Sequence, residues 1–337
     1  MTEPVVLTRR EGRAGRITLN RPKALHALDT TMCQLMTDAL LAWRNDSAVE
    51  LIVIDHTGDR GFCAGGDLRM MAESGCSDGA EARRFFLTEY RLNHLLHAYP
   101  KPVAAVLDGV TMGGGVGISV HGSHRIATER TLFAMPETAI GLFPDVGGGW
   151  FLPRLEHHVG TWLALTGARI KGRDTLSVGV ATHFCPSADV ELLKTQLAER
   201  GLEALQRLET TGPRMPHHEG ALVPLFGRES IEAILQALDA AKEPWTSAQA
   251  EVLRARSPLS LAVTLEHLRR GRAASRFEDV MTMEFRLATR MVRTHDFQEG
   301  VRAVIIEKDN APRWSTEPVD LEALFAPLPD GEWTPLP

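Results

Sequence analysis

Two acidic residues and a run of three glycines are the residues of this sequence whose types and spacing best suit chemistry. Gly113, Gly114 and Gly115 follow the apolar run 103–107 and precede the segment 116–120, which suits the start of a buried helix. Bare amide N–H groups at such a start can approach and polarise a negative atom, because no Cβ stands in the way. The glycine run therefore predicts hydrogen-bond donors for a negative charge that develops on a substrate oxygen.

The two carboxylates follow closely along the chain. Glu137 comes after Pro136 and Asp145 after Pro144, both in apolar, glycine-rich surroundings that shift the pKa of a carboxyl group. Each feature also has a structural explanation: close helix–strand packing for the glycines, a helix dipole for Glu137 and a helix N-cap for Asp145. Their coincidence within 33 residues (113 to 145) favours acyl chemistry.

Other catalytic patterns are incomplete in this sequence. No G-x-G-x-x-G is completed, the P-loop spacing at Gly167 and Gly172 lacks its Lys and Ser/Thr, and the segment 117–121 is one residue short of a nucleophile elbow. The histidine pairs, among them His121 and His124, have no carboxylate or cysteine at metal-ligand spacing, which favours structural roles and no metal site. A dinucleotide enzyme, an NTPase and a serine hydrolase are therefore disfavoured.

The composition is that of an ordinary globular protein. Of 337 residues, 44% are hydrophobic and 24% charged, and the net charge of -6 gives no reason to expect nucleic acid or an anionic membrane as a partner. Four cysteines without C-x-x-C spacing fit a reducing compartment. No apolar run approaches a membrane span, and the first residues do not resemble a leader, so we expect a cytoplasmic protein.

Strand and helix patterns alternate over the first part of the chain. Strands are expected at 4–8, 15–20, 51–54, 103–107 and 124–127. Helices are expected after the N-cap candidates Asp29 and Asp67 and over 80–96. The order strand, glycine turn, helix occurs twice, at 51–73 and 103–121, which predicts an α/β fold with parallel strands.

The second part of the chain is expected to be largely helical. Helical periodicity dominates from about residue 155, and the segment 212–224 is rich in proline and glycine. We therefore divide the chain into a core at 1–211 and a linker with a C-terminal helical region at 212–337, which ends in a proline-rich tail from 315.

These residues resemble the crotonase (enoyl-CoA hydratase/isomerase) superfamily and, within it, the 3-hydroxyisobutyryl-CoA hydrolases. The most specific block is 133–149, which reads FAMPETAIGLFPDVGGG and ends in FLPR at 151–154. The resemblance extends over nearly the whole chain, through LNRPKALHAL at 19–28, FCAGGD at 62–67, the stretch 109–122, MEFRL at 283–287 and HDFQEGVRA at 295–303.

The resemblance implies a ClpP-like spiral of ββα repeats around an acyl-CoA site, capped by C-terminal helices. By this likeness the amides of Gly66 and Gly114 form an oxyanion hole around the thioester carbonyl. Glu137 and Asp145 match the active-site acids, and Glu89 matches a further carboxylate that contacts substrate. No metal or redox cofactor is implied, and relatives commonly assemble as trimers or as dimers of trimers.

One position departs from the hydratases of this family. They carry a glutamate shortly after the glycine run, where this chain has Gly117. Hydration of a C=C bond needs one group to activate water and another to deliver a proton, so its loss favours hydrolysis of a short 3-hydroxyacyl-CoA, as in valine catabolism. An enoyl-CoA hydratase or isomerase is the first alternative, and a non-catalytic acyl-CoA-binding protein the second.

Overall fold

Two sheets form the centre of the protein, seen in a computed structural model that describes residues 3–214, 220–318 and 320–336. The first sheet has the order β1 (Val6–Glu11), β2 (Ala14–Leu19), β3 (Leu51–His56), β5 (Val103–Leu107), β7 (His124–Ala127), β10 (His183–Phe184). The second has the order β4 (Gly61–Cys63), β6 (Val110–Met112), β8 (Leu132–Ala134), β9 (Ile170–Lys171). All neighbours are parallel except β1 with β2 and β8 with β9.

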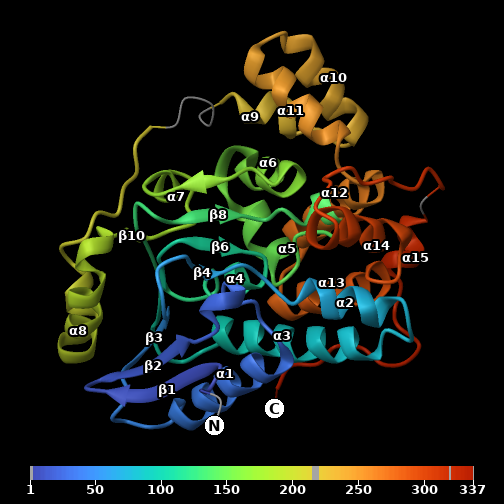
Figure 1. Ribbon diagram of the computed structural model, residues 1–337. Helices are drawn as coiled ribbons and strands as arrows, with labels where there is room; N and C mark the ends of the chain where they lie inside the picture. Colours follow the sequence, from blue (N-terminus) through green and yellow to red (C-terminus); the bar gives the residue numbers. More distant parts are fainter. Residues whose placement is uncertain (1–2, 215–219, 319, 337) are drawn as a thin grey trace.

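The chain reaches this arrangement by winding as a spiral. Each turn gives one strand to the first sheet and the next strand to the second, in the pairs β3 and β4, β5 and β6, β7 and β8 (Figure 1). The strands β3 and β5 are buried along their whole length, which explains the uninterrupted apolar sequences at 51–54 and 103–107. The predicted α/β class and crotonase spiral are therefore confirmed.

Helices cover the spiral. Their bounds are α1 (Thr30–Trp43), α2 (Leu68–Gly75), α3 (Ala80–His97), α4 (Gly114–Gly117), α5 (Gly148–Phe151), α6 (Val159–Thr166), α7 (Asp174–Ser177), α8 (Val190–Arg200), α9 (Leu222–Phe226), α10 (Ile231–Ala241), α11 (Pro244–Arg254), α12 (Pro258–Ala273), α13 (Phe277–Met291), α14 (His295–Val301) and α15 (Leu321–Phe325). Asp29 caps α1 through Met32 N and Asp67 caps α2 through Met70 N, as the sequence predicted.

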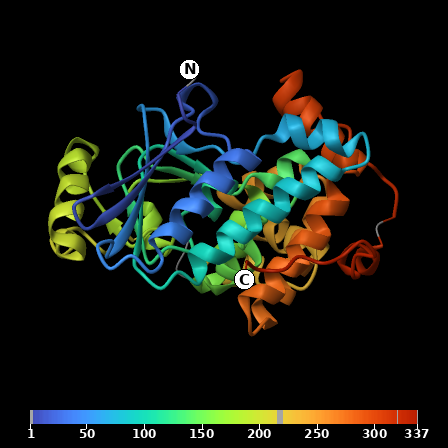
Figure 2. The same ribbon diagram turned by 90° about the horizontal axis from the view of Figure 1, so that it is seen from below.

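The helices α1, α3 and α13 lie side by side although α13 comes from the far end of the chain (Figure 2). This packing brings C-terminal residues such as Phe285 into the same hydrophobic cluster as Leu28 near the N-terminus. The helices α9, α10 and α11 lie together at one end of the molecule in Figure 1. The predicted boundary at 211/212 stays a prediction, and residues 215–219 of the expected linker lie outside the described part of the chain.

The second part of the chain is largely helical, as expected, with more structure than its sequence pattern indicates. The strands β9 and β10, of two residues each, add to the two sheets after residue 155. The proline-rich segment after 315 contains α15 and buries Trp333, and Arg83 and Arg91 donate hydrogen bonds to its carbonyl groups. Within the described residues, no helix is both long and apolar enough to cross a membrane.

Candidate active site

Three neighbouring strands of the second sheet bring the predicted site residues together. Gly66 follows β4 by three residues, Gly114 follows β6 by two, and Glu137 follows β8 by three. Because β4, β6 and β8 are adjacent and parallel, the segments that follow them meet at the same edge of the sheet. The topology therefore converts three positions separated by 71 residues (66 to 137) into one site.

The two glycine segments approach each other closely. A Cβ built on Gly65 would lie 3.7 Å from the Gly114 nitrogen, and one built on Gly114 would lie 2.5 Å from Glu89 Oε1. A side chain at position 114 would therefore collide with the carboxyl group. Among the described residues, neither the Gly66 nor the Gly114 N–H donates to a protein acceptor. Both amides remain available to a ligand.

A small cavity of about 60 Å³ lies at this edge. Its polar lining consists of the two glycine segments and the carboxyl groups of Glu89, Glu137 and Asp145. Its apolar walls come from Leu68, Met71, Phe86, Met112, Ile140, Leu142 and Val146. No cationic side chain lines it within the described part of the chain. All five predicted site residues thus line one cavity, and their catalytic roles stay predictions.

Glu89 and Tyr90 are neighbours on α3: Glu89 lines the cavity, and the hydroxyl of Tyr90 reaches Asp145. Glu89 is buried, and its Oε1 has no hydrogen-bond partner among the described residues. Burial raises the pKa of Glu89 well above its ordinary value, and the charges of Asp145, Glu137 and Glu284 raise it further. A neutral Glu89 can donate a hydrogen bond as well as accept one.

Asp145 is held by Tyr90, whose hydroxyl donates to Asp145 Oδ2 at 2.7 Å. Burial raises the pKa of Asp145 to about 7, although the Tyr90 hydrogen bond opposes the rise and the charge of Glu284 adds to it. A carboxyl group with this pKa exchanges its proton near neutral pH, which suits it to acid–base catalysis.

Glu137 stands at the start of the 3-10 helix Glu137–Ile140, directly beside the glycine run. A Cβ built on Gly113 would lie 3.2 Å from Glu137 Oε1, and Oε2 has no partner among the described residues. Burial and the charge of Asp145 raise the pKa of Glu137 well above its ordinary value. The free oxygen of a buried carboxyl group next to two free amides is the arrangement that attack on a carbonyl carbon needs.

The structure also shows two polar contributors that the sequence reasoning missed. The helix expected at 80–96 includes Tyr90, to which no role in the site was assigned. Glu284 is fully buried behind the segment 145–149 and contacts His267. The MEFRL block that contains Glu284 stood out in the sequence only as part of the resemblance, since the two amides that bind Glu284 lie more than 130 positions away.

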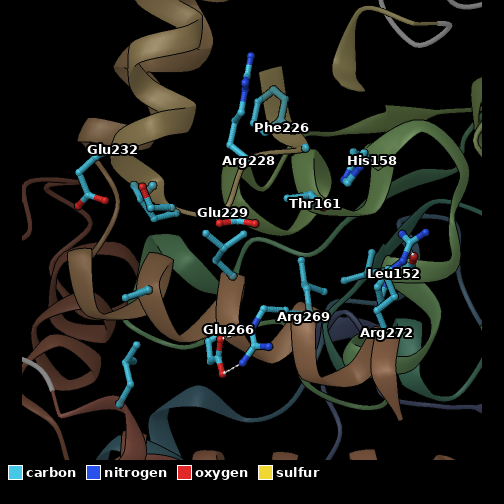
Figure 3. A pocket seen from close by; sticks show the side chains of 18 of the residues that line it. Leu152, His158, Thr161, Phe226, Arg228, Glu229, Glu232, Glu266, Arg269 and Arg272 are labelled. Carbon is cyan, nitrogen blue, oxygen red and sulfur yellow. Dashed lines mark hydrogen bonds and ion pairs between the residues drawn. The ribbon is translucent and has the colours of Figure 1, made fainter. Parts of the chain in front are cut away.

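A second cavity, of about 460 Å³, lies between α10 and α12 (Figure 3). Its charged side chains are largely engaged with the protein: Arg269 pairs with Glu266 at 2.6 Å and Arg272 donates to the Pro153 carbonyl. None of the predicted site residues lines it. This cavity is therefore no candidate for the acyl chemistry.

The family follows from a comparison with known sequences. The profile of the family described as enoyl-CoA hydratase/isomerase matches residues 14–323. The chain belongs to the enoyl-CoA hydratase/isomerase family.

Curated relatives in this family carry the name of a hydrolase. The chain is 45% identical to the mitochondrial 3-hydroxyisobutyryl-CoA hydrolase of Gallus gallus, over 98% of this chain and 89% of that protein. It is 43% identical to the protein of the same name from Homo sapiens, over 94% of this chain and 85% of that protein. The resemblance predicted from the sequence is confirmed.

Solved structures in the family carry other names. A carnitinyl-CoA dehydratase from Mycobacterium thermoresistibile superposes with a TM-score of 0.93 at 38% identity, over 98% of this chain and 99% of that one. An enoyl-CoA hydratase from Rhodobacter sphaeroides superposes with a TM-score of 0.91 at 41% identity, over 98% and 100% of the two chains. These names and those of the curated relatives describe different reactions of CoA esters.

The comparison corrects one expectation. The cytoplasmic location is contradicted, because the curated relatives are mitochondrial by name. Cysteine usage and composition could not reveal this, since they report a reducing environment and not which reducing compartment contains the protein.

Proposed function

We propose that this enzyme hydrolyses a short 3-hydroxyacyl-CoA thioester, 3-hydroxyisobutyryl-CoA, to the free hydroxy acid and CoA. The observation that carries the proposal is the meeting of the Gly66 and Gly114 amides with Glu137 Oε2 in one cavity, where none of the three has a partner among the described residues. The names of the curated relatives support the same substrate. The reaction is the one expected of valine catabolism.

The thioester carbonyl would sit with its oxygen against the two amides. As the carbonyl carbon is attacked, negative charge develops on this oxygen, and each preorganised N–H contributes about 3 kcal/mol to the stability of the transition state. The burial of the site increases this contribution, because water does not compete for the amides.

Glu137 would act in its ionised form, either by attacking the carbonyl carbon or by taking a proton from the water that attacks it. Its raised pKa makes the carboxylate a stronger base than a solvent-exposed glutamate. Asp145, whose pKa is about 7, would give a proton to the departing sulfur or orient the 3-hydroxyl group. Glu89 would bind the same hydroxyl group.

The size and lining of the cavity support a short, hydroxylated acyl group. The cavity of about 60 Å³ has apolar walls and little room for a long acyl chain, and its buried carboxyl groups offer hydrogen bonds to a hydroxyl group. A purely aliphatic acyl group would leave these carboxyl groups without partners, which costs binding energy.

Position 117 argues against hydration of a double bond. A Cβ at Gly117 would lie 2.5 Å from Val146 Cβ and 2.9 Å from Asn93 Nδ2, so a glutamate does not fit there. Hydration needs two such groups, and this chain has Glu137 but no glutamate at position 117. The names of the two solved relatives keep this reaction as the alternative to test.

Release of free thiol from a panel of CoA esters tests the proposal. We expect release from 3-hydroxyisobutyryl-CoA, slower release from unsubstituted and long-chain esters, and loss of most activity in Glu137→Gln and Asp145→Asn. Asp108→Asn is a matched control, because its buried carboxyl group pairs with Arg130 outside the cavity.

Two results would contradict hydrolysis. Loss of enoyl absorbance without thiol release would identify a hydratase. Tight binding of CoA esters without turnover, unaltered by Glu137→Gln, would identify a non-catalytic binding protein. The proposed mechanism uses no metal or redox cofactor, and a trimer-based assembly is a separate proposal that light scattering on the purified protein tests.

A further inference from the structure

Val146, the residue that follows Asp145, has an unfavourable backbone conformation. Val146 has a φ of +52°, in the left-handed region that β-branched residues rarely adopt, and Gly147 follows with a φ of +83°. Such a conformation persists only where the surrounding structure holds it, and it is common at functional sites. The contacts of the Val146–Gly147 peptide therefore show what holds the segment after Asp145 in place.

Both polar groups of the Val146–Gly147 peptide form hydrogen bonds to side chains. On one side, His121 Nε2 lies 2.7 Å from the Val146 carbonyl oxygen. Burial lowers the pKa of His121 to about 3, so the neutral ring donates the Nε2 proton to this carbonyl. On the other side, the Gly147 N–H donates to Glu284 Oε2 at 2.7 Å.

Glu284 holds a second point of the same segment. The Gly149 N–H donates to Glu284 Oε1 at 3.0 Å, and His267 Nε2 lies 3.1 Å from that oxygen. Both Glu284 and His267 are fully buried, on α13 and α12 respectively. One carboxylate with two acceptor oxygens therefore binds two amides of the segment that carries Asp145.

We propose that Glu284 is a positioning residue that holds the segment 145–149 so that Asp145 keeps its place against Tyr90 and the cavity. The inference rests on the proposed function for its effect on the reaction, whereas the geometry stands by itself. It assigns a role to the MEFRL block of the sequence, whose glutamate reaches the site only through the fold.

The negative charge of Glu284 acts on the same residue. It is one cause of the raised pKa of Asp145, after burial. The other titratable groups that face Asp145 and its segment are Glu89 and Tyr90 on α3, Glu137 after β8, His121 after α4 and His267 on α12. Removing the charge of Glu284 should lower the pKa of Asp145, because ionised Asp145 then has one fewer negative neighbour.

Two substitutions separate the hydrogen bonds from the charge. Glu284→Gln removes the charge and leaves one acceptor oxygen, and its NH₂ group then faces a glycine N–H. Glu284→Asp keeps the charge but shortens the side chain, so it cannot reach both amides. Because misplacement of a catalytic group by about 1 Å can cost roughly 100-fold in rate, we expect either variant to lower kcat by about 10- to 100-fold.

The pH dependence distinguishes positioning from a general loss of structure. In Glu284→Gln the limb of the pH–kcat profile that Asp145→Asn abolishes should move to lower pH, whereas in Glu284→Asp it should stay in place. Asp108→Asn, a buried carboxyl group outside the cavity, should leave both kcat and the limb at their wild-type values.

Tyr90 offers a measurement that does not depend on activity. The chain has two tyrosines, Tyr90 and Tyr99, and only Tyr90 donates to Asp145, whereas Tyr99 donates to the Leu40 carbonyl. In protein labelled with ¹³Cζ-tyrosine, the Tyr90 signal should titrate with Asp145 near pH 7 in the wild type and at lower pH in Glu284→Gln. The Tyr99 signal is the internal control, and the spectrum of Tyr90→Phe shows which of the two signals belongs to Tyr90.

The outcomes decide the inference separately from the function. A folded Glu284→Gln protein with wild-type kcat and a wild-type Tyr90 midpoint overturns it. If Glu284→Gln does not fold, Glu284→Asp and His121→Ala decide: lower kcat in both supports the inference, and wild-type kcat in both overturns it. If the wild type releases no thiol from any ester, the proposed function fails and the Tyr90 titration still decides the role of Glu284.

Discussion

Replacing Asp145 with asparagine should stabilise the protein, and increasingly so as the pH rises. Burial raises the pKa of Asp145 from 3.8 to about 7. A group with a raised pKa in the folded state contributes stability that is present below the unfolded value and is lost as the pH rises through the folded value. The asparagine carries no titrating proton and escapes this loss.

The size of the effect follows from the shift. A rise of about three pKa units corresponds to roughly 4 kcal/mol of unfolding free energy that the wild type loses by pH 8, at about 1.36 kcal/mol per unit. Part of this loss has already occurred at pH 5, so the advantage of Asp145→Asn should grow by about 2–3 kcal/mol between pH 5 and pH 8.

Urea unfolding of the two proteins at pH 5, 6, 7 and 8 measures this growth. The pH dependence of the difference in unfolding free energy matters more than its absolute value. An asparagine NH₂ group without a partner lowers the stability by the same amount at every pH. A difference that stays constant or shrinks from pH 5 to pH 8 would refute the reasoning, since Asp145 would then not carry a raised pKa.

Three further substitutions test other parts of the structure. Asp55→Asn should have the opposite pH dependence. Burial raises the pKa of Asp55, but ion pairs with Lys194 (3.0 Å) and an arginine outweigh burial and keep this pKa below its ordinary value. Its loss should cost about 3–5 kcal/mol near pH 7 and less in acid, as urea unfolding would show. Tyr90→Phe removes a charge-assisted hydrogen bond worth about 1.5–3 kcal/mol. The midpoint of the Asp145 limb in the pH–rate profile should therefore move to higher pH by about 1–2 pH units. Gly117→Ala places a Cβ 2.5 Å from a neighbouring side-chain carbon and should cost about 1–3 kcal/mol in thermal or urea unfolding.

Much of the first sheet could be predicted from the sequence. The segments 51–54 and 103–107 are continuous apolar runs because both faces of their strands are buried, and the pattern identifies them directly. The strands β4, β6 and β8 were missed, because a strand of three residues has too little periodicity to recognise. These short strands are nevertheless the ones that bring Gly66, Gly114 and Glu137 together.

Part of the site could also be predicted from the sequence. The glycines and acids stand out by residue type, and the resemblance added Glu89 and the pairing of Gly66 with Gly114. Glu284 and His121 could not be assigned from the sequence, because their contacts with residues 146–149 depend on how α13 and the segment after α4 pack. A buried hydrogen bond between distant positions has no local sequence pattern.

The absence of cationic side chains from the lining of the cavity, within the described part of the chain, has a consequence for turnover. The acyl group enters as an uncharged ester and leaves as a carboxylate. The cavity binds the uncharged form through hydrogen bonds to the carboxyl groups of Glu89, Glu137 and Asp145. Once any of these groups is ionised, its negative charge repels the product anion. The hydroxy acid should therefore depart readily and inhibit the enzyme only weakly, so that accumulating product does little to slow the next cycle.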